Sequence, residues 1–272
     1  MFDNNNLQTF PKKTFYPDLK QSGFLVLLFL PAMLLAAFLG EILKSININA
    51  DIINLTTYVF SLGTIVAIAF ICKKQVGDKP ALRYSKKVSV WVYILAIPAI
   101  IGLGGLVDII GVMILPEMPE SLKESLEQAM HPNLPTILTA VVAAPIFEEI
   151  ICRGIICEGL IKNISPRAGI LWSAFIFALI HLNPWQGISA FAIGCFLGWI
   201  YWKAHSILPC IFIHFINNGL AVYLYYYYGK LGYDLDADIS EIYQVSEIFM
   251  IVIYAAIFLA SFLLLSKILK SK

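Results

Sequence analysis

The sequence predicts an all-α fold, a polytopic membrane helical bundle of about eight transmembrane helices with cytoplasmic N- and C-termini. Hydrophobic residues make up 59% of the 272 residues and charged residues only 14%, and the mean hydropathy is +0.79. Mostly apolar runs of about 18 residues or more, long enough to cross a bilayer as a helix, recur along the whole chain. We therefore expect a single integral membrane domain over residues 1–272 that contacts the lipid bilayer and no nucleic acid.

The apolar runs assign the individual spans. A polar N-terminal tail precedes an apolar stretch from Phe24 to Leu39, which is longer than the apolar region of a signal peptide, so we interpret it as a retained first span. The third span is long enough to tilt or kink, and Pro98 and the glycines that follow it would allow a kink. The expected spans are residues 23–42, 53–72, 88–115, 134–160, 167–183, 187–204, 207–228 and 246–266.

Basic residues assign the orientation. All of the 19 Lys and Arg residues except Lys44, Lys123 and Lys230 fall on the side of the spans that holds both termini. The positive-inside rule places that side in the cytoplasm. In the outer loop after the third span, Pro119 opens a segment with apolar residues spaced by four, which predicts a short amphipathic helix at the outer interface. Acidic residues gather on this outer side: Glu117, Glu120, Glu124, Glu127, Asp234, Asp236, Asp238 and Glu241.

The fourth span contains three charged residues, Glu148, Glu149 and Arg153. A charge near the centre of a membrane helix costs about 2.5–3.5 kcal/mol on insertion scales, so these groups need partners. Glu149 and Arg153 are four residues apart on one helical face and can form an ion pair. Glu148 points about 100° away around the helix and can face a different neighbour.

Polar residues also occur in the fifth and seventh spans. Phe177 lies one helical turn before His181, and His214 lies one turn before Asn218. With a rise of about 1.5 Å per residue, Glu148, His181 and Asn218 lie about 16–21 Å from the inner ends of their spans, and His214 lies at about 10 Å. These depths predict that the polar side chains share one pocket within the membrane.

Three motifs on successive apolar helices resemble those of the CPBP family, the CAAX-protease and bacteriocin-processing (Abi) family of intramembrane proteases. The resemblance covers residues 134–228, which it marks as the catalytic core, and it extends to the layout of eight spans. Cys152 departs from it, because the family commonly has an aromatic residue there. The motifs are Glu148-Glu149-x-x-x-Arg153, Phe177-x-x-x-His181 and His214-x-x-x-Asn218.

The resemblance implies an intramembrane endopeptidase whose substrate is a membrane-associated protein or peptide, of the CAAX or leader-peptide type. Glu148 with His181 could hold and deprotonate water, and His214 with Asn218 could donate hydrogen bonds to the oxyanion. The remaining motif residues would support these four groups without touching the substrate: Glu149, Arg153 and Phe177.

A metal site is an open alternative at the same residues. Glu148, His181 and His214 would make a three-ligand zinc site with an open position for water. The sequence has no His-Glu-x-x-His helix, so a divalent metal such as zinc is possible without being required, and the choice between a metallo- and a glutamate-type protease stays open.

Other functions compete with proteolysis. Buried Glu, His and Arg residues also mark the ion pathways of transporters and proton relays, although the sequence shows no convincing internal repeat. A scaffold, regulator or bacteriocin-immunity protein of the same fold would keep the helices without catalysis. The abundance of Ile, Asn and Lys suggests an AT-rich bacterial genome, and hence a bacterial inner membrane.

Overall fold

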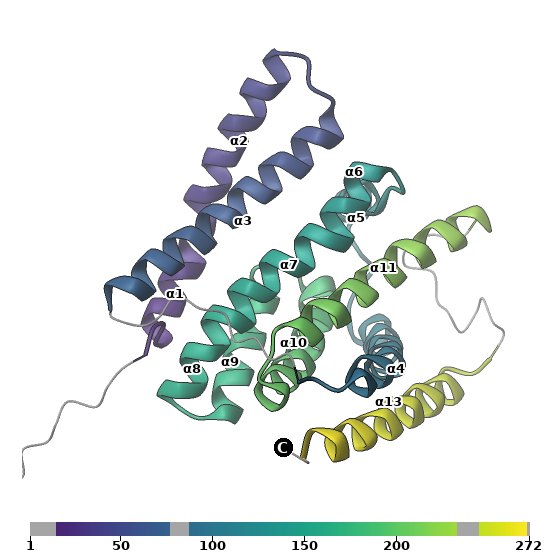
Figure 1. Cartoon of the computed structure of the whole chain (residues 1–272). Coiled ribbons are helices and arrows are strands. Elements are labelled where there is room, and N and C mark those ends of the chain that lie inside the picture. The colour runs from purple at the N-terminus through teal and green to yellow at the C-terminus, as the bar shows by residue number, and fades with distance from the viewer. Residues whose placement is uncertain (1–14, 77–86, 233–244, 271–272) are drawn as a thin grey trace, which may run out of the picture.

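The computed structural model describes residues 15–76, 87–232 and 245–270, and within them it confirms an all-α, polytopic membrane bundle (Figure 1). The sidedness of the termini stays a prediction. Parts of the predicted basic and acidic loops, including Lys79, Arg83 and residues 234–241, lie outside the described residues. In the described parts, seven helical stretches are long and apolar enough to cross a membrane: Leu19–Ser45, Ala50–Gln75, Val90–Ile114, Leu134–Asn163, Pro184–Ala204, Leu208–Lys230 and Glu247–Lys270.

The fifth predicted span, residues 167–183, is shorter than expected. Its helix, α9 (Pro166–Leu179), has 14 residues and falls below the length of the seven stretches. The cause is local, because Asn183 caps the start of α10 (Pro184–Ala204) and Pro184 occupies that helix's first turn. Between the two helices Leu182 adopts a positive φ of 57°. The eight predicted segments are therefore all helical, but one of them is too short to span by itself.

Three N-terminal helices form one side of the molecule: α1 (Leu19–Leu27), α2 (Phe29–Ser45) and α3 (Ala50–Gln75). The Asp18 side chain accepts a hydrogen bond from the Gln21 backbone and closes a capping box at the start of α1. Helices α2 and α3 form a hairpin that stands apart from α4, α11 and α13 (Figure 1).

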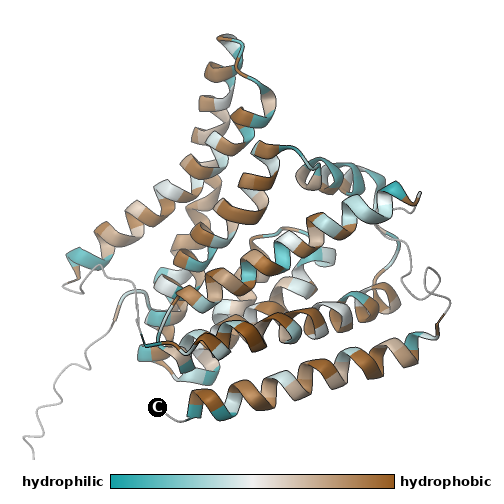
Figure 2. Cartoon of the chain, turned by 45° about the vertical axis from the view of Figure 1, so that its right-hand side comes forward, coloured by the Kyte–Doolittle hydropathy of each residue, from teal (hydrophilic) through white to brown (hydrophobic). Residues whose placement is uncertain are grey.

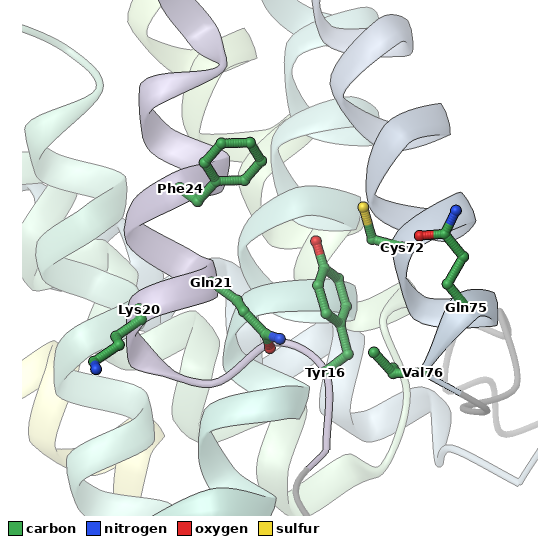
Figure 3. Close-up of a pocket in the computed structure, with 7 residues that line it drawn as sticks. All are labelled: Tyr16, Lys20, Gln21, Phe24, Cys72, Gln75 and Val76. Atoms are coloured by element: carbon green, nitrogen blue, oxygen red, sulfur yellow. The ribbon is translucent and has the colours of Figure 1, made fainter.

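The segment before α1 packs against the C-terminal end of the fourth span. Asn163 accepts a hydrogen bond from the Phe15 backbone at 2.9 Å and donates to the Phe15 carbonyl at 2.7 Å. Gly159 has no room for a Cβ atom, because Pro17 lies against it. A pocket of about 410 Å³ opens beside this segment (Figure 3), and its lining residues are Tyr16, Lys20, Gln21, Phe24, Cys72, Gln75 and Val76.

Helices α4 (Val90–Ile114) and α13 (Glu247–Lys270) pack side by side (Figure 1). A Cβ atom at Gly102 would lie 2.7 Å from the Phe258 backbone nitrogen, and one at Gly105 would lie 2.5 Å from the Tyr254 ring. The helix is continuous through Pro98. Gly102 and Gly105 therefore serve the close approach of α13.

The fourth span is one continuous helical stretch that changes its hydrogen-bond register twice. Two π-helical turns flank the short α-helix that carries Glu148 and Glu149. Each register change widens the helix locally, and such turns are frequent at functional sites. The segments, in order, are α6 (Leu134–Ile137), η1 (Leu138–Ala143), α7 (Ala144–Glu149), η2 (Ile150–Cys157) and α8 (Glu158–Asn163).

The predicted amphipathic segment forms α5 (Glu120–Met130). Leu122, Leu126 and Met130 are half-buried, whereas Glu124 and Glu127 are exposed, as the spacing predicts. Figure 2 shows this polar helix near the end of a bundle whose long helices are mostly apolar. Its position at the outer membrane interface stays a prediction.

Candidate active site

A buried ion pair forms the base of the polar cluster. Arg153 Nη1 donates to Glu149 Oε1 at 2.8 Å, and both side chains are 0% exposed, so the pair that the spacing predicts is present. Arg153 Nη2 also donates to the Gly194 carbonyl of α10 at 3.1 Å. The Phe177 ring lies 4.5 Å from the guanidinium carbon. These contacts offset part of the cost of burying two charges, although Glu149 Oε2 and Arg153 Nε have no hydrogen-bond partner, and they tie the fourth span to α9 and α10.

Gly194 is a glycine for a physical reason. A Cβ atom there would lie 3.1 Å from Ala174 of α9 and 3.2 Å from Arg153 Nη2. Gly194 and Gly198, four residues apart, both bring α10 close to α9. The sequence did not predict that the Gly194 carbonyl would serve as an acceptor for Arg153.

His214 of α11 (Leu208–Lys230) lies between the two carboxylates. Its Nδ1 atom is 2.9 Å from Glu149 Oε1, and its Nε2 atom is 3.8 Å from Glu148 Oε2. An ionised carboxylate only accepts hydrogen bonds, so the network assigns the donated proton to Nδ1. Nε2 therefore faces Glu148, and the buried ion pair orients the histidine ring.

Glu148 has a different surrounding from Glu149. Its side chain is 15% exposed, and its Oε1 atom accepts a 2.6 Å hydrogen bond from the Tyr58 hydroxyl of α3. The sequence predicts that Glu148 faces a neighbour other than Arg153, and the structure identifies that neighbour. Sequence reasoning missed Tyr58, because a tyrosine within an apolar span carries no motif. Its hydroxyl within the span was the one available signal, since a buried tyrosine O–H usually has a partner.

His181 lies in the turn after α9, whereas the predicted span extended through it. Its Nδ1 atom is 2.7 Å from the Phe177 carbonyl, which requires that Nδ1 carry the proton and donate. Asn183 donates to the His181 carbonyl at 2.9 Å and stabilises the turn. The Phe177 ring packs edge-on against His181 at 5.0 Å and against His214 at 5.7 Å, so it joins the two histidines.

Asn218 lies one turn beyond His214 on α11, and its amide nitrogen donates to the Ala140 carbonyl at 2.8 Å. The carbonyl is available for a reason. In η1 the Ala144 N–H donates five residues back to Thr139, and in that register the next residue would donate to Ala140. That residue is Pro145, which has no N–H. Asn218 therefore replaces a missing backbone donor and joins α11 to η1.

The structure brings most of the predicted site residues together. Direct contacts link Glu148, Glu149 and His214, and Phe177 connects this group to Arg153 and His181. Asn218 is bound to backbone nearby.

The zinc alternative finds little support in this arrangement. Among the residues that the structure describes, no three His, Cys, Asp or Glu side chains are placed to hold one metal ion. Glu148, His181 and His214 are therefore not placed as a common donor set in this part of the chain. We derive no step through a metal.

Comparison with known proteins agrees with the motifs. Residues 130–220 match the family model of type II CAAX prenyl endopeptidases, described as Rce1-like, and the match contains all three motifs. Neither the curated proteins nor the solved structures contain a match. The family match confirms the resemblance to CPBP intramembrane proteases over about a third of the chain, while α1 to α4 and α13 lie outside it.

Proposed function

We propose, on the match of residues 130–220 to the Rce1-like CAAX endopeptidase family model, that this integral membrane protein hydrolyses a peptide bond of a membrane-associated protein or peptide. We further propose a glutamate-type mechanism within a catalytic core of residues 134–228. The observation that carries this proposal is the contrast between adjacent carboxylates: Glu149 is 0% exposed and its Oε1 atom contacts both Arg153 and His214, whereas Glu148 is 15% exposed and faces His214.

The contrast supports different roles for the two carboxylates. Glu149 Oε1 already binds Arg153 and His214, so it holds the helix and the imidazole in place. Glu148 Oε2 lies 3.8 Å from His214 Nε2, beyond hydrogen-bond distance, and it can accept a proton from water. Glu148 is therefore the proposed general base, and His181 would help to hold the water.

The proposed reaction conserves protons. The water oxygen attacks the carbonyl carbon of the peptide bond while Glu148 takes one water proton, which gives a tetrahedral oxyanion. The oxyanion then re-forms the carbonyl, the carbon–nitrogen bond breaks, and the proton passes from Glu148 to the leaving amine. The products are a carboxylic acid and an amine, and the free carboxylate of Glu148 is restored.

His214 and Asn218 are the proposed donors to the oxyanion. With both ring nitrogens protonated, His214 donates from Nδ1 to Glu149 and can donate from Nε2 to the substrate. Asn218 uses one amide hydrogen for the Ala140 carbonyl and has a second amide hydrogen to offer. Donors held by such contacts need little rearrangement when charge develops, which is the main source of oxyanion stabilisation.

Cleavage of membrane-bound peptides by purified protein in lipid nanodiscs tests the proposal. The substrates are a prenylated CAAX peptide and a membrane-anchored leader peptide. We expect Glu148→Ala and His181→Ala each to lower kcat by about 10²–10⁴-fold, the range for loss of a general base or its partner. Glu41→Ala, at an exposed carboxylate of α2, is the control and should cleave as wild type does.

Two results would contradict the proposal. Equal cleavage by Glu148→Ala and wild type would mean that Glu148 is not the general base. If wild type cleaves neither substrate and Glu148→Ala leaves the cellular phenotype unchanged, a scaffold or immunity protein would be favoured. A chelator arm addresses the mechanism, because a glutamate-type enzyme should keep its activity after exhaustive chelation.

The substrate and the membrane are finer proposals. A bacterial inner membrane follows from the composition, and a CAAX-type or leader-peptide substrate follows from the family. Proteomics of membrane fractions, comparing cells that carry wild type with cells that carry Glu148→Ala, should reveal the proteins whose uncleaved forms accumulate.

A further inference from the structure

We propose that Tyr58 is a positioning residue of this site, which holds Glu148 Oε1 so that Oε2 is the oxygen that takes the proton from water. The inference rests on the proposed function and adds a residue that lies outside the family-matched segment 130–220. It also makes the α2–α3 hairpin part of the active site.

The contact between Tyr58 and Glu148 is short and specific. The phenol donates to Glu148 Oε1 at 2.6 Å across 90 residues of sequence. Hydrogen bonds from O–H groups to carboxylates have this length and are about twice as strong as neutral ones. The bond therefore restrains the carboxylate.

Packing of α3 directs Tyr58 toward the site. A stripe of buried residues on α3 starts one turn after Tyr58 and comprises Leu62, Ile65 and Ala69. The stripe packs against η2 in one apolar cluster, in which Tyr58 also lies. The backbone position of Tyr58 is thus set by apolar contacts and does not depend on its hydroxyl.

A restraint on Glu148 matters because, in an unrestrained side chain, the two carboxylate oxygens are chemically equivalent. The terminal torsion of glutamate is broad and roughly two-fold, so a free carboxylate exchanges its oxygens easily. With Oε1 bound to Tyr58, Oε2 is the oxygen that faces His214 Nε2 at 3.8 Å. Tyr58 therefore selects one oxygen and one direction for proton transfer.

The test compares Tyr58→Phe with a matched control. We expect Tyr58→Phe to lower kcat by about 10- to 100-fold and to leave KM unchanged, because a hydrogen bond to a charged group is lost while substrate contacts remain. The control is Tyr201→Phe, which removes a similar phenol–carboxylate bond to Glu158 at 2.9 Å and should keep wild-type kcat.

Two unnatural residues at position 58 keep the test valid if Tyr58→Phe does not fold. 4-Aminophenylalanine keeps a donor at the same place, and 4-methylphenylalanine fills the space without a donor. The amino residue should restore most of kcat, and the methyl residue should not.

Glu148→Ala, assayed in parallel, separates the two proposals. If Glu148→Ala is inactive while Tyr58→Phe keeps wild-type kcat, or changes KM alone, the positioning role is wrong and the proposed function stands. If Glu148→Ala cleaves normally, the proposed function is wrong, and the positioning role fails with it.

Discussion

Two carboxylate–cation pairs occur on the same continuous helical stretch, and they differ in almost everything except their spacing. Glu149 pairs with Arg153 and Glu158 pairs with Lys162, each four residues apart, at 2.8 Å and 2.9 Å. The first pair is 0% exposed at both side chains. In the second pair Lys162 is 39% exposed and Glu158 is 10% exposed.

The partners of the two pairs explain the difference. Lys162 lies in the last turn of α8, where water and the helix dipole solvate a cation. Arg153 lies inside the bundle and requires the Gly194 carbonyl and the Phe177 ring in addition to Glu149. Identical spacing therefore gives one pair whose lysine reaches solvent and one fully buried pair that three helices must support.

The largest loss of stability is expected when the side chain of Arg153 is replaced. Arg153→Met should destabilise the protein by about 3–5 kcal/mol, because Glu149 would be left as an uncompensated buried charge. Denaturant unfolding in mixed micelles measures this loss. Arg167→Met, at an exposed arginine, is the control. A loss below about 1 kcal/mol for Arg153→Met would mean that the buried pair is not structurally required.

An intermediate effect is expected at Gly194, which supports Arg153 from α10. Gly194→Ala should destabilise the protein, because overpacking against Ala174 and Arg153 costs about 1–3 kcal/mol and exceeds the helix-propensity gain of about 1 kcal/mol. The matched control is Gly187→Ala on the same helix, where the nearest atom to an added Cβ lies 3.7 Å away. Equal melting temperatures for the two variants would refute the close-packing argument.

The smallest effect is expected at the Glu158–Lys162 pair, whose lysine is 39% exposed. Lys162→Ala should change the free energy of unfolding by less than about 1 kcal/mol, because Lys162 is accessible to solvent and the Tyr201 hydroxyl still donates to Glu158, and the effect should shrink further in high salt. The same unfolding assay at two salt concentrations measures it. A loss as large as that of Arg153→Met would show that exposure does not distinguish the two pairs.

Local patterns in the sequence predicted the local part of the site. The Glu149–Arg153 pair depends on helical spacing alone, and the amphipathic α5 depends on the spacing of Leu122 and Leu126, so both were predictable. The length of α9 could also have been predicted, because Asn183-Pro184 is a signal for a helix start. The apolar run continues through this signal and led to a longer predicted span.

The remaining contacts depend on how helices meet, which a single sequence does not encode in any short pattern. The approach of His214 to Glu149 and the bond from Tyr58 to Glu148 join residues 65 and 90 positions apart. The bond from Asn218 to Ala140 requires knowledge that η1 shifts its register before Pro145. Burial of Arg153 likewise follows from packing and could not be predicted from charge spacing.

The short α9 has a consequence for the surrounding lipid. Its 14 residues rise about 21 Å, against a hydrocarbon thickness of about 30 Å. Its exposed Leu171, Trp172 and Phe175 help to line an apolar pocket of about 440 Å³ with Phe191. Such a mismatch is relieved by local thinning of the bilayer. Acyl chains beside α9 should therefore be compressed. The hydrocarbon layer should be thinnest on this flank, so water or an extended peptide should have the shortest path there to the turn that carries His181.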